Sequence, residues 1–491
     1  MFAIEINKEN YEYDIQALVK SFYPEEQIAV LLPESRPERR AELADKVRIR
    51  LLVEEEAGCG EADSIRATLT VDEKSYHFTG KENGGAGKSA MKRFFYEVLS
   101  RETGKELPWG NLIGIRPTKI AYSMLEEGKT GEEIIAHYRQ EHGTSPEKAK
   151  LALEIAQRER ELLSGVHYEN GYSLYIGIPF CPTTCLYCSF TSYAIGAYRK
   201  QVEAYVDSVI KEMEYVAEAH KSQILDSVYI GGGTPTTLEA EQLDRLITRL
   251  KELFDFSTVQ EFTVEAGRAD SITEEKLQVL YRHGVTRISV NPQTMKQETL
   301  DIIGRRATVK QVEEAYALAR KVGFDNINMD LILGLPGEME EDVRHTIERV
   351  VELAPDSLTV HSLAIKRASR LNQWIQEYGV SMLHNTDETM EIAAEGARRL
   401  GLVPYYLYRQ KNMSGNFENV GYAREGKLGL YNILIMEEKQ TIIALGAGSI
   451  TKRVFGDGRI ERCENVKDVV QYIERIDEMI ERKRKLFAEV E

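Results

Sequence analysis

The sequence predicts an α/β protein built around a partial parallel barrel of six β/α units, (β/α)6, with α+β parts before and after it. From residue 173 onward, six apolar, strand-like runs are each followed by helical periodicity. Glycines or polar side chains come at the carboxyl ends of these runs, where the active sites of parallel barrels lie. Six units are fewer than the eight of a closed barrel, so we expect the barrel to be open on one side.

Residues 1–105 predict a small N-terminal α+β domain. Helices are expected near 10–21 and 88–102, together with the strand-like runs FAIEI, IAVLLP, VRIRLLVEE, IRATLTVD and SYHFTG. The stretch ENGGAGKSA resembles a phosphate-binding loop, but the required first glycine would fall at Glu82. We interpret it as the glycine-rich end of a hairpin that leads into a helix.

Residues 106–168 predict a helical linker region, because the Gly- and Pro-punctuated stretch PWGNLIGIRPTKI precedes helical periodicity over about 119–163. Residues 169–400 form the predicted barrel, with a further helix around 386–400. Its strands are predicted at 173–179, 226–230, 259–266, 287–291, 326–333 and 357–361.

Residues 401–491 predict a C-terminal α+β extension. LYNILIM and TIIALGAG are expected to form a hairpin joined by EEKQ. One amphipathic helix over about 465–486 is expected to close the chain. Its buried stripe would consist of Val469, Ile473, Ile476 and Ile480.

Composition limits the class of protein. A formal net charge of -16 argues against binding to nucleic acid or to an anionic membrane surface. The N-terminus lacks the pattern of a secretory signal, and no apolar run approaches the length of a membrane span. Besides three clustered cysteines the chain has only Cys59 and Cys463, expected to be inert thiols, which suits a reducing compartment. We therefore predict a cytoplasmic protein.

Three cysteines follow the first barrel strand in the loop of Cys181, Cys185 and Cys188, spaced C-x3-C-x2-C. Soft thiolates bind iron–sulfur clusters, zinc or Cu(I), and three ligands would leave one metal position open for chemistry. A structural zinc site would need a fourth ligand, which this loop does not supply. Three unrelated buried thiols are the other alternative.

The remaining strand ends also carry polar groups. The second strand leads into GGGTPT, whose glycines let a backbone approach a ligand closely. The later strands end at Glu265, at Asn291 and Gln293, at Asp330 followed by GLPGE, and at His361 and Ser362. Singly, each is more often a helix cap or a loop hydrogen bond. Together they predict one site at this edge of the sheet.

The cysteine loop, with Tyr187 directly before Cys188, resembles that of the radical S-adenosylmethionine (SAM) enzymes, in which three cysteines hold a [4Fe–4S] cluster and the fourth iron binds SAM. The wider set of motifs resembles the branch of the oxygen-independent coproporphyrinogen III oxidases and heme chaperones, and looks closest to the HemZ type. Those motifs are YIGIPFCP, GGGTPT, VEAGR, RISVNPQ, IGRR, NMDLILGLPGE and LGAGS.

This resemblance implies a role for each matching residue. Cys181, Cys185 and Cys188 would hold the cluster, and Glu265 would hold the SAM that binds it. Other contacts to that SAM would come from Tyr175, Tyr187, Gly232, Gly233 and Thr234. In the oxidases a second SAM occupies the positions of Gln293, Arg305 and Asp330, so the chain is expected to bind one SAM or two.

The implied reaction is the radical decarboxylation of two propionates of coproporphyrinogen III to vinyl groups, which gives protoporphyrinogen IX. It needs an electron donor such as flavodoxin or ferredoxin. Cations suit the four carboxylates of this tetrapyrrole, and tyrosines offer aromatic area, although YYLYR also fits a strand with two inward tyrosines. The candidates are Arg305, Arg306, Lys366, Arg367, Arg370, Arg409, Lys411, Tyr405, Tyr406 and Tyr408.

The chain departs from the oxidase pattern at two positions. Phe190 stands where the oxidases have a fourth cysteine, as in the chaperone branch, and Gly177 stands where they have a histidine. A heme chaperone and a heme-degrading radical SAM enzyme are therefore the alternatives. A chaperone would favour an iron-ligating side chain at the barrel mouth, and His361 is the obvious candidate, although a satisfied hydrogen bond is its commoner role.

Overall fold

The computed structural model describes residues 1–24, 26–56, 64–81, 86–114, 116–366, 369–379, 382–409 and 417–488. Two compact units make up the chain. The N-terminal unit comprises Met1–Glu154 with Arg409–Glu418, and the barrel unit comprises Ile155–Tyr408 with Asn419–Glu491. The four-part division at residues 105, 168 and 400 stays a prediction.

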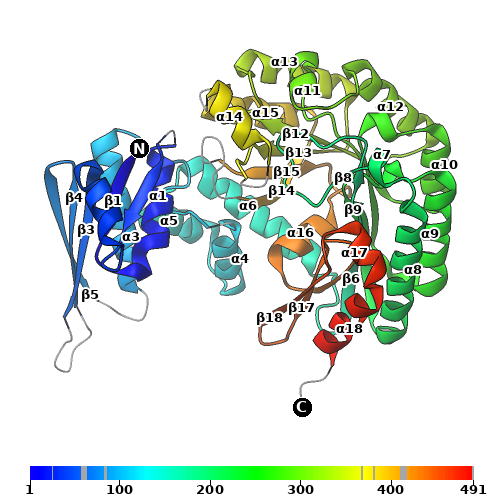
Figure 1. Ribbon diagram of the computed structural model, residues 1–491, viewed down its shortest axis with the longest axis horizontal. Coiled ribbons are helices and arrows are strands. Elements are labelled where there is room, and N and C mark those ends of the chain that lie inside the picture. The colour runs from blue at the N-terminus through cyan, green and yellow to red at the C-terminus, as the bar shows by residue number, and fades with distance from the viewer. Residues whose placement is uncertain are drawn as a thin grey trace. The chain divides into compact units, whose positions relative to one another are not determined.

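The N-terminal unit contains a five-stranded sheet in the order β2-β1-β3-β4-β5 (Figure 1). All five predicted strands are present, as β1 (Phe2–Ile6), β2 (Ile28–Leu31), β3 (Val47–Glu56), β4 (Ser64–Val71) and β5 (Lys74–Lys81). Buried side chains of α1 (Glu12–Phe22) and α3 (Ala86–Thr103), among them Phe22 and Phe95, form the core with the sheet. The helices that follow are α4 (Thr118–Glu126), α5 (Gly131–His142) and α6 (Pro146–Leu163). One short helix, α2 (Pro37–Leu43), was not predicted.

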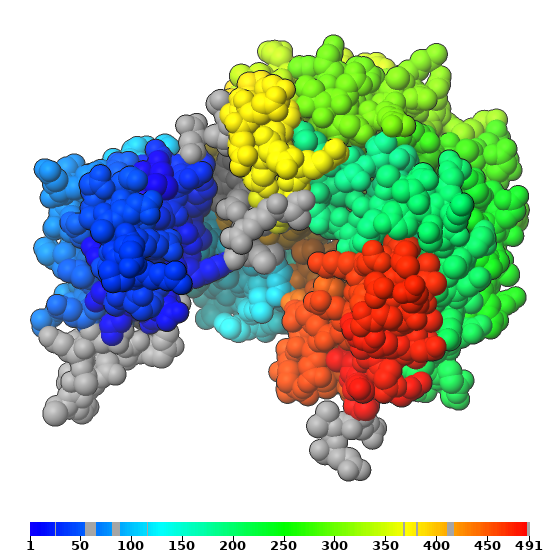
Figure 2. Space-filling model, viewed as in Figure 1, coloured from blue at the N-terminus to red at the C-terminus, as the bar shows by residue number. Residues whose placement is uncertain are grey.

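The barrel unit contains the six predicted parallel strands, in the spatial order in which they occur along the chain. They are β6 (Gly171–Ile178), β9 (Ile224–Gly232), β10 (Glu261–Gly267), β11 (Arg287–Val290), β12 (Ile327–Leu333) and β13 (Ser357–Ser362). Helices on the outer side follow these strands (Figure 1), and their side chains contribute to the large green surface of Figure 2. They are α8 (Val202–Ala219), α9 (Ala240–Leu253), α10 (Glu274–Arg282), α12 (Val309–Val322), α13 (Glu340–Leu353) and α15 (Asp387–Arg399). Parallel strands need such crossover helices, so the carboxyl ends of all six strands meet at one edge of the sheet.

Additional strands extend this sheet at both sides. Beyond β13 lie β15 (Asn419–Ala423) and β14 (Val403–Tyr408), which are antiparallel to their neighbours. Beyond β6 lie β16 (Thr441–Leu445), β17 (Ile450–Val454) and β18 (Ile460–Glu464). The tyrosines of β14 include two buried ones, Tyr405 and Tyr406, which agrees with the structural interpretation of YYLYR.

The predicted C-terminal hairpin is wrong. LYNILIM forms a helix, α16 (Leu430–Glu437), and β16 pairs in parallel with β6 instead of with this segment. The run is apolar on all sides, so periodicity could not separate a buried strand from a buried helix. Glu261 stabilises the helix, because its carboxylate accepts hydrogen bonds from the backbone N–H groups of Leu430 and Tyr431 at 2.5 and 3.4 Å.

The closing helix is also divided in two, α17 (Val469–Glu474) and α18 (Ile476–Phe487), which meet at Arg475. Its predicted stripe is buried at Val469, Ile476 and Ile480, and partly buried at Ile473. None of the helices in the described part of the chain combines the length and the apolar character that a membrane crossing requires.

A buried ion pair ties the C-terminal extension to the barrel. Lys483 Nζ of α18 lies 2.6 Å from Glu212 Oε1 of α8, and both side chains are almost fully buried. The other oxygen of Glu212 accepts hydrogen bonds from Gly446 N at 2.9 Å and from the Tyr472 hydroxyl at 2.5 Å. Every charge in this network has a partner, as a buried charge requires.

Candidate functional site

The cysteine loop lies at the carboxyl edge of the barrel. After β6, a two-residue strand, β7 (Phe180–Cys181), pairs with β8 (Tyr193–Ala194) and closes the loop at its base. Two hydrogen bonds fix the loop to the turn after α11 (Gln297–Ile302): Thr183 Oγ1 donates to Gly304 O at 2.8 Å, and Leu186 N donates to Ile303 O at 2.9 Å. All three cysteines are free thiols.

Donors surround the sulfur atoms. Thr234 Oγ1 donates to Cys181 Sγ at 3.5 Å, and Arg268 Nη1 lies 3.8 Å from Cys185 Sγ. Cys188 Sγ is 3.6 Å from Ser192 Oγ. Burial raises the pKa of Cys181 to about 11, so its thiol must lose a proton when a metal binds. Hydroxyl and guanidinium donors of this kind stabilise thiolates once they form.

Three free thiols on one loop are a donor set whose chemistry fits an iron–sulfur cluster. Among the residues that the structure describes, no three His, Cys, Asp or Glu side chains converge as ligands of one metal ion. A four-iron cluster needs no such convergence, because each cysteine binds a different iron. The predicted ligands Cys181, Cys185 and Cys188 therefore stay the candidates for it.

Glu265 lies on the inner side of β10, close to the glycine loop after β9. Its Oε1 accepts a hydrogen bond of 2.5 Å from the Tyr229 hydroxyl, and its Oε2 accepts one of 3.2 Å from Gly232 N. Burial raises the pKa of Glu265 to about 7, whereas the bond from Tyr229 lowers it. Tyr175 stacks on Tyr229 with ring centroids 6.2 Å apart, and Tyr431 of α16 stacks on Tyr229 at 4.4 Å.

The glycine loop also contacts the strand that leads to the cysteines. A Cβ atom at Gly233 would lie 2.6 Å from Phe180 O, so this position has no room for a side chain. The next residue is Thr234, which donates to Cys181. The structure thus brings Tyr175, Gly232, Gly233, Thr234 and Glu265 together beside the cysteine loop.

The remaining residues predicted to bind a cofactor form a second group, held together by hydrogen bonds. Gln293 N donates to Asp330 O at 2.9 Å, and Gln293 adopts a positive φ of 69°, which is rare outside glycine. Arg305 donates to Asn291 O at 2.5 Å and to the Tyr187 hydroxyl at 3.4 Å. Asp330 lies in the middle of β12, not at its end as predicted, because the apolar run continues past it to Leu333.

The tetrapyrrole candidates do not all lie together. Arg409 belongs to the N-terminal unit, where it donates to Leu112 O. Arg305 already donates to Asn291 O and to the Tyr187 hydroxyl. Arg306 is exposed beside the cysteine loop, and Arg370 donates to Thr184 O of that loop at 2.5 Å. Lys366 is half-buried. Arg367 and Lys411 lie outside the described residues.

His361 is hydrogen-bonded at Nδ1. Nδ1 is 3.3 Å from the Tyr408 hydroxyl, and Nε2 is 4.0 Å from Asp330 Oδ1. Burial lowers the pKa of His361. The satisfied hydrogen bond that we expected for this histidine is therefore present.

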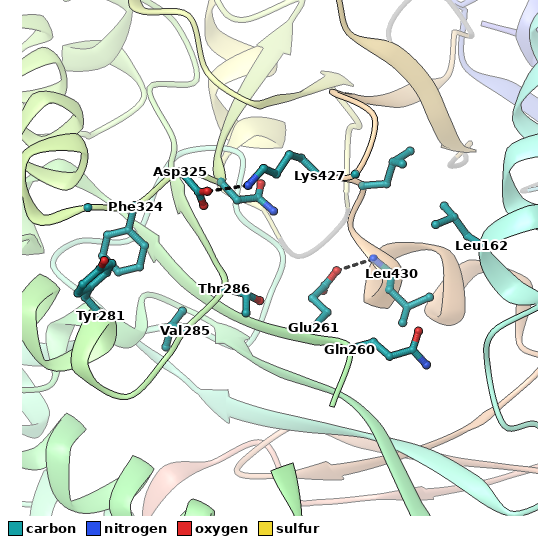
Figure 3. A pocket seen from close by; sticks show the side chains of 14 residues that line it. Leu162, Gln260, Glu261, Tyr281, Val285, Thr286, Phe324, Asp325, Lys427 and Leu430 are labelled. Carbon is teal, nitrogen blue, oxygen red and sulfur yellow. Dashed lines mark hydrogen bonds and ion pairs between the residues drawn. The ribbon is translucent and has the colours of Figure 1, made fainter. Parts of the chain in front are cut away.

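A pocket of about 390 Å³ lies at the opposite, amino edge of the barrel strands (Figure 3). Gln260, Thr286 and Asn326, each at or just before the start of a strand, line it together with Glu261 and the ion-paired Lys427 and Asp325. None of the residues predicted to bind a cofactor lines this pocket.

Sequence reasoning missed Tyr229, Arg268 and Tyr431. Tyr229 comes two residues before Gly231 on a strand, so alternation of side chains could have placed it on the inner face beside Glu265. Arg268 is the last residue of the motif VEAGR, three residues after Glu265. Tyr431 offered no signal, because its segment was assigned to a strand.

Comparisons with known proteins agree with this geometry. The sequence profile of the "Radical SAM superfamily" matches residues 175–350. The chain is 41% identical over 417 residues to the oxygen-independent coproporphyrinogen-III oxidase-like protein HemZ of Bacillus subtilis, covering 84% of this chain and 83% of that protein. It is 38% identical over 194 residues to the heme chaperone HemW of Lactococcus lactis, covering 40% and 49% of the two chains.

Among solved structures, coproporphyrinogen III oxidase (HemN) from Escherichia coli has the same fold. The TM-score is 0.52 at 24% identity, with 65% of this chain and 72% of that chain covered. The long match to HemZ, the profile match over the barrel and this shared fold lead to one conclusion. The chain belongs to the radical SAM superfamily, in the HemN and HemZ type family.

Proposed function

We propose that this protein is an oxygen-independent coproporphyrinogen III dehydrogenase that converts two propionates of its substrate to vinyl groups. The observation that carries the proposal is the placement of three free cysteines next to Glu265 and the glycine loop at one edge of the barrel, in a chain so similar to HemZ. Cys181, Cys185 and Cys188 would hold a [4Fe–4S] cluster. When bound, the reduced cluster and SAM supply a carbon-centred radical that removes one hydrogen atom from the substrate.

The chain's own residues would bind and orient the reactants. The carboxylate of Glu265, which accepts hydrogen bonds from Tyr229 and Gly232, would hold the SAM through its amino group. Gly233 leaves the backbone close to the cysteine loop, and Thr234 donates to a cluster ligand. Asn291 links Arg305 to Asp330, and Gln293 N donates to Asp330 O. These three residues, Gln293, Arg305 and Asp330, would form the second SAM site.

The substrate carboxylates would meet Arg306 and Arg370, the predicted cations beside the cysteine loop, and the half-buried Lys366. A guanidinium group binds a carboxylate through two parallel hydrogen bonds. For each propionate the products are a vinyl group, carbon dioxide and one electron, which a separate acceptor must take up.

Turnover tests the proposal directly. Reconstituted protein is mixed anaerobically with dithionite, SAM and coproporphyrinogen III, and 5′-deoxyadenosine and carbon dioxide are followed together by mass spectrometry. We expect both products, in a ratio of about one to one. Deoxyadenosine without carbon dioxide would contradict the proposed substrate.

A heme chaperone is the second candidate, favoured by Phe190 and by the match to HemW. It predicts stable binding of intact heme with no carbon dioxide released. Because His361 is buried and hydrogen-bonded to the Tyr408 hydroxyl, we expect His361→Ala to leave any heme affinity within about twofold. Heme titration of the wild type and this variant separates the two candidates.

Tyr229→Phe is expected to weaken SAM binding, and most strongly near pH 7. The hydroxyl of Tyr229 lowers the pKa of Glu265, so its removal raises that pKa above about 7. A larger fraction of Glu265 is then protonated at neutral pH and is a weaker acceptor for a hydrogen bond from the SAM amino group. At about pH 9 both proteins carry an ionised Glu265, and their affinities should converge.

Calorimetric titration with SAM across this pH range measures the effect. Tyr431→Phe is the matched control, because it removes a hydroxyl from the same aromatic stack without touching Glu265. If Tyr229→Phe and wild type bind SAM equally at pH 7, Tyr229 does not position this carboxylate.

A further inference from the structure

Arg268 is a buried cation directly beside the cysteine loop. It follows Gly267, the last residue of β10, and its side chain is only 4% exposed. Every nitrogen atom of its guanidinium group has a partner: Nε and Nη2 donate to Asp270, and Nη1 donates to Thr183. A buried arginine needs such partners, because its charge has lost most of its contact with water. The proposed contacts to SAM and to the substrate do not involve this side chain.

One nitrogen of the guanidinium group points at the cysteine loop. Nη1 donates to Thr183 O at 3.0 Å and to Thr183 Oγ1 at 2.8 Å, and it lies 3.8 Å from Cys185 Sγ. Thr183 Oγ1 donates in turn to Gly304 O, so a chain of hydrogen bonds runs from Arg268 through the loop to the turn after α11. The positive charge of Arg268 is therefore held next to one of the proposed cluster ligands.

Asp270 binds the opposite side of the same guanidinium group. Nε donates to Asp270 Oδ1 at 2.9 Å, and Nη2 donates to Oδ2 at 2.6 Å, which is the parallel two-bond geometry of arginine with a carboxylate. In the planar guanidinium group, Nη1 points away from the edge that Nε and Nη2 form. The cation thus lies between the carboxylate of Asp270 and the thiol of Cys185, and the thiol is on the side of the positive charge.

The backbone around Arg268 is fixed as well. Gly267 adopts a φ of 60°, which glycine tolerates without strain and which turns the chain at the end of β10. Ser271 N and Ser271 Oγ both donate to Arg268 O, at 3.0 and 2.7 Å, and close a short 3-10 helix at Ala269–Ser271. The position of the guanidinium group is therefore determined by the protein itself.

Arg305 is a second cation that acts on Cys185. Burial lowers the pKa of Arg305, but the Tyr187 hydroxyl and the Cys185 thiol raise it, and the net result is a pKa above the ordinary value. Arg305 belongs to the proposed second SAM site, whereas Arg268 donates to the cysteine loop and is paired with Asp270. Removing Arg268 would leave Arg305 in place, so we expect such a change to shift the properties of a cluster rather than to abolish its binding.

We propose that Arg268 and Asp270 set the reduction potential of the cluster that the three cysteines would hold. The inference rests on the proposed function, since it concerns the cluster at that site. Reduction adds one electron, and therefore one negative charge, next to Cys185. The charge of Arg268 and its N–H group beside Cys185 Sγ stabilise the reduced form more than the oxidised form and raise the potential. Asp270 lowers it from the other side. Both are positioning residues, because they act through the cysteine ligand.

Redox titration of the reconstituted protein with dithionite, followed by the electron paramagnetic resonance signal of the reduced cluster, tests the proposal. SAM is left out, so that its binding does not contribute. We expect Arg268→Gln to make the one-electron reduction about tenfold less favourable, which lowers the potential by about 59 mV. Arg268→Lys keeps the charge but loses the planar fork, so its potential should lie between those of the wild type and Arg268→Gln.

Asp270→Asn should shift the potential in the opposite direction. The substitution keeps the size of the side chain and removes its negative charge, so the charge of Arg268 is no longer offset and the potential should rise. If Arg268 and Asp270 only held the loop in place, both substitutions would break the same pair of hydrogen bonds and act alike. Potentials that shift in the same direction, or that stay at the wild-type value, would overturn the proposal.

Arg282→Gln is the matched control. It removes a positive charge from an exposed pair with Asp244 on the outer helices, so the potential should not change. Iron analysis and circular dichroism show whether each variant holds a cluster and folds. If Arg268→Gln does not take up iron, Arg268→Lys and Asp270→Asn still decide the sign of the effect. A wild-type protein that takes up no reducible cluster would instead contradict the proposed function.

Discussion

Replacing Cys181 with alanine is expected to remove the iron–sulfur cluster and all formation of 5′-deoxyadenosine while the barrel stays folded. Cys181 is partly exposed on the short strand β7, outside the hydrophobic core. The cluster would keep only two of its three protein ligands and lose its anchorage. Iron analysis after reconstitution and product analysis by mass spectrometry measure the loss, and circular dichroism monitors the fold.

Cys463→Ala is the matched control. Cys463 is a free, buried cysteine on β18 with no place in the loop. We expect this variant to bind iron and to turn over as the wild type does, with a stability cost of about 1 kcal/mol for the small cavity. Full iron content in Cys181→Ala, or loss of iron in Cys463→Ala, would contradict the assignment of the ligands.

Glu212→Ala is expected to destabilise the barrel unit by about 3–5 kcal/mol. The substitution leaves the ammonium group of Lys483 buried with Asn465 Oδ1 as its remaining partner, at 2.9 Å. It also removes the acceptor of Gly446 N and of the Tyr472 hydroxyl, so two buried donors lose their partner. Urea unfolding gives the change in the free energy of unfolding.

Two further variants show whether the loss of stability comes from breaking the buried ion pair or from removing any carboxylate of α8. Glu214→Ala, on the same helix, breaks only an exposed pair with Arg249 and should cost less than about 1 kcal/mol. Combining Glu212→Leu with Lys483→Met removes both charges and should restore much of the stability. A cost below about 1 kcal/mol for Glu212→Ala would mean that water reaches Lys483 in solution.

The sequence predicted the strands and helices of the barrel, because each of these elements is marked by the residues of its own segment. The six strands are short apolar runs with helices between them, and the right-handed crossover then places their carboxyl ends together. This is why Cys181, Gly232 and Glu265, distant in sequence, were expected at one edge. The spacing of the three cysteines is visible in eight residues of sequence, so these metal ligands could be predicted without knowledge of the fold.

Features that depend on distant partners could not be predicted. The apolar segment of α16 becomes a helix because Glu261, 169 residues away, accepts hydrogen bonds from its first N–H group. Glu212 and Lys483 are 271 residues apart, and no pattern in either helix indicates the pair. Asp330 lies in the middle of a strand that is otherwise largely apolar, so the sequence does not show which of its residues is level with the site.

Electron paramagnetic resonance of the reduced, reconstituted protein, with and without SAM, is the sharpest test of the proposed site. Glu265 and the glycine loop, the proposed SAM site, lie beside the loop of the three cysteines. We expect the spectrum of the reduced cluster to change when SAM is added, because SAM would bind the iron that has no cysteine ligand. A spectrum that is the same with and without saturating SAM would show that SAM does not bind at the cluster.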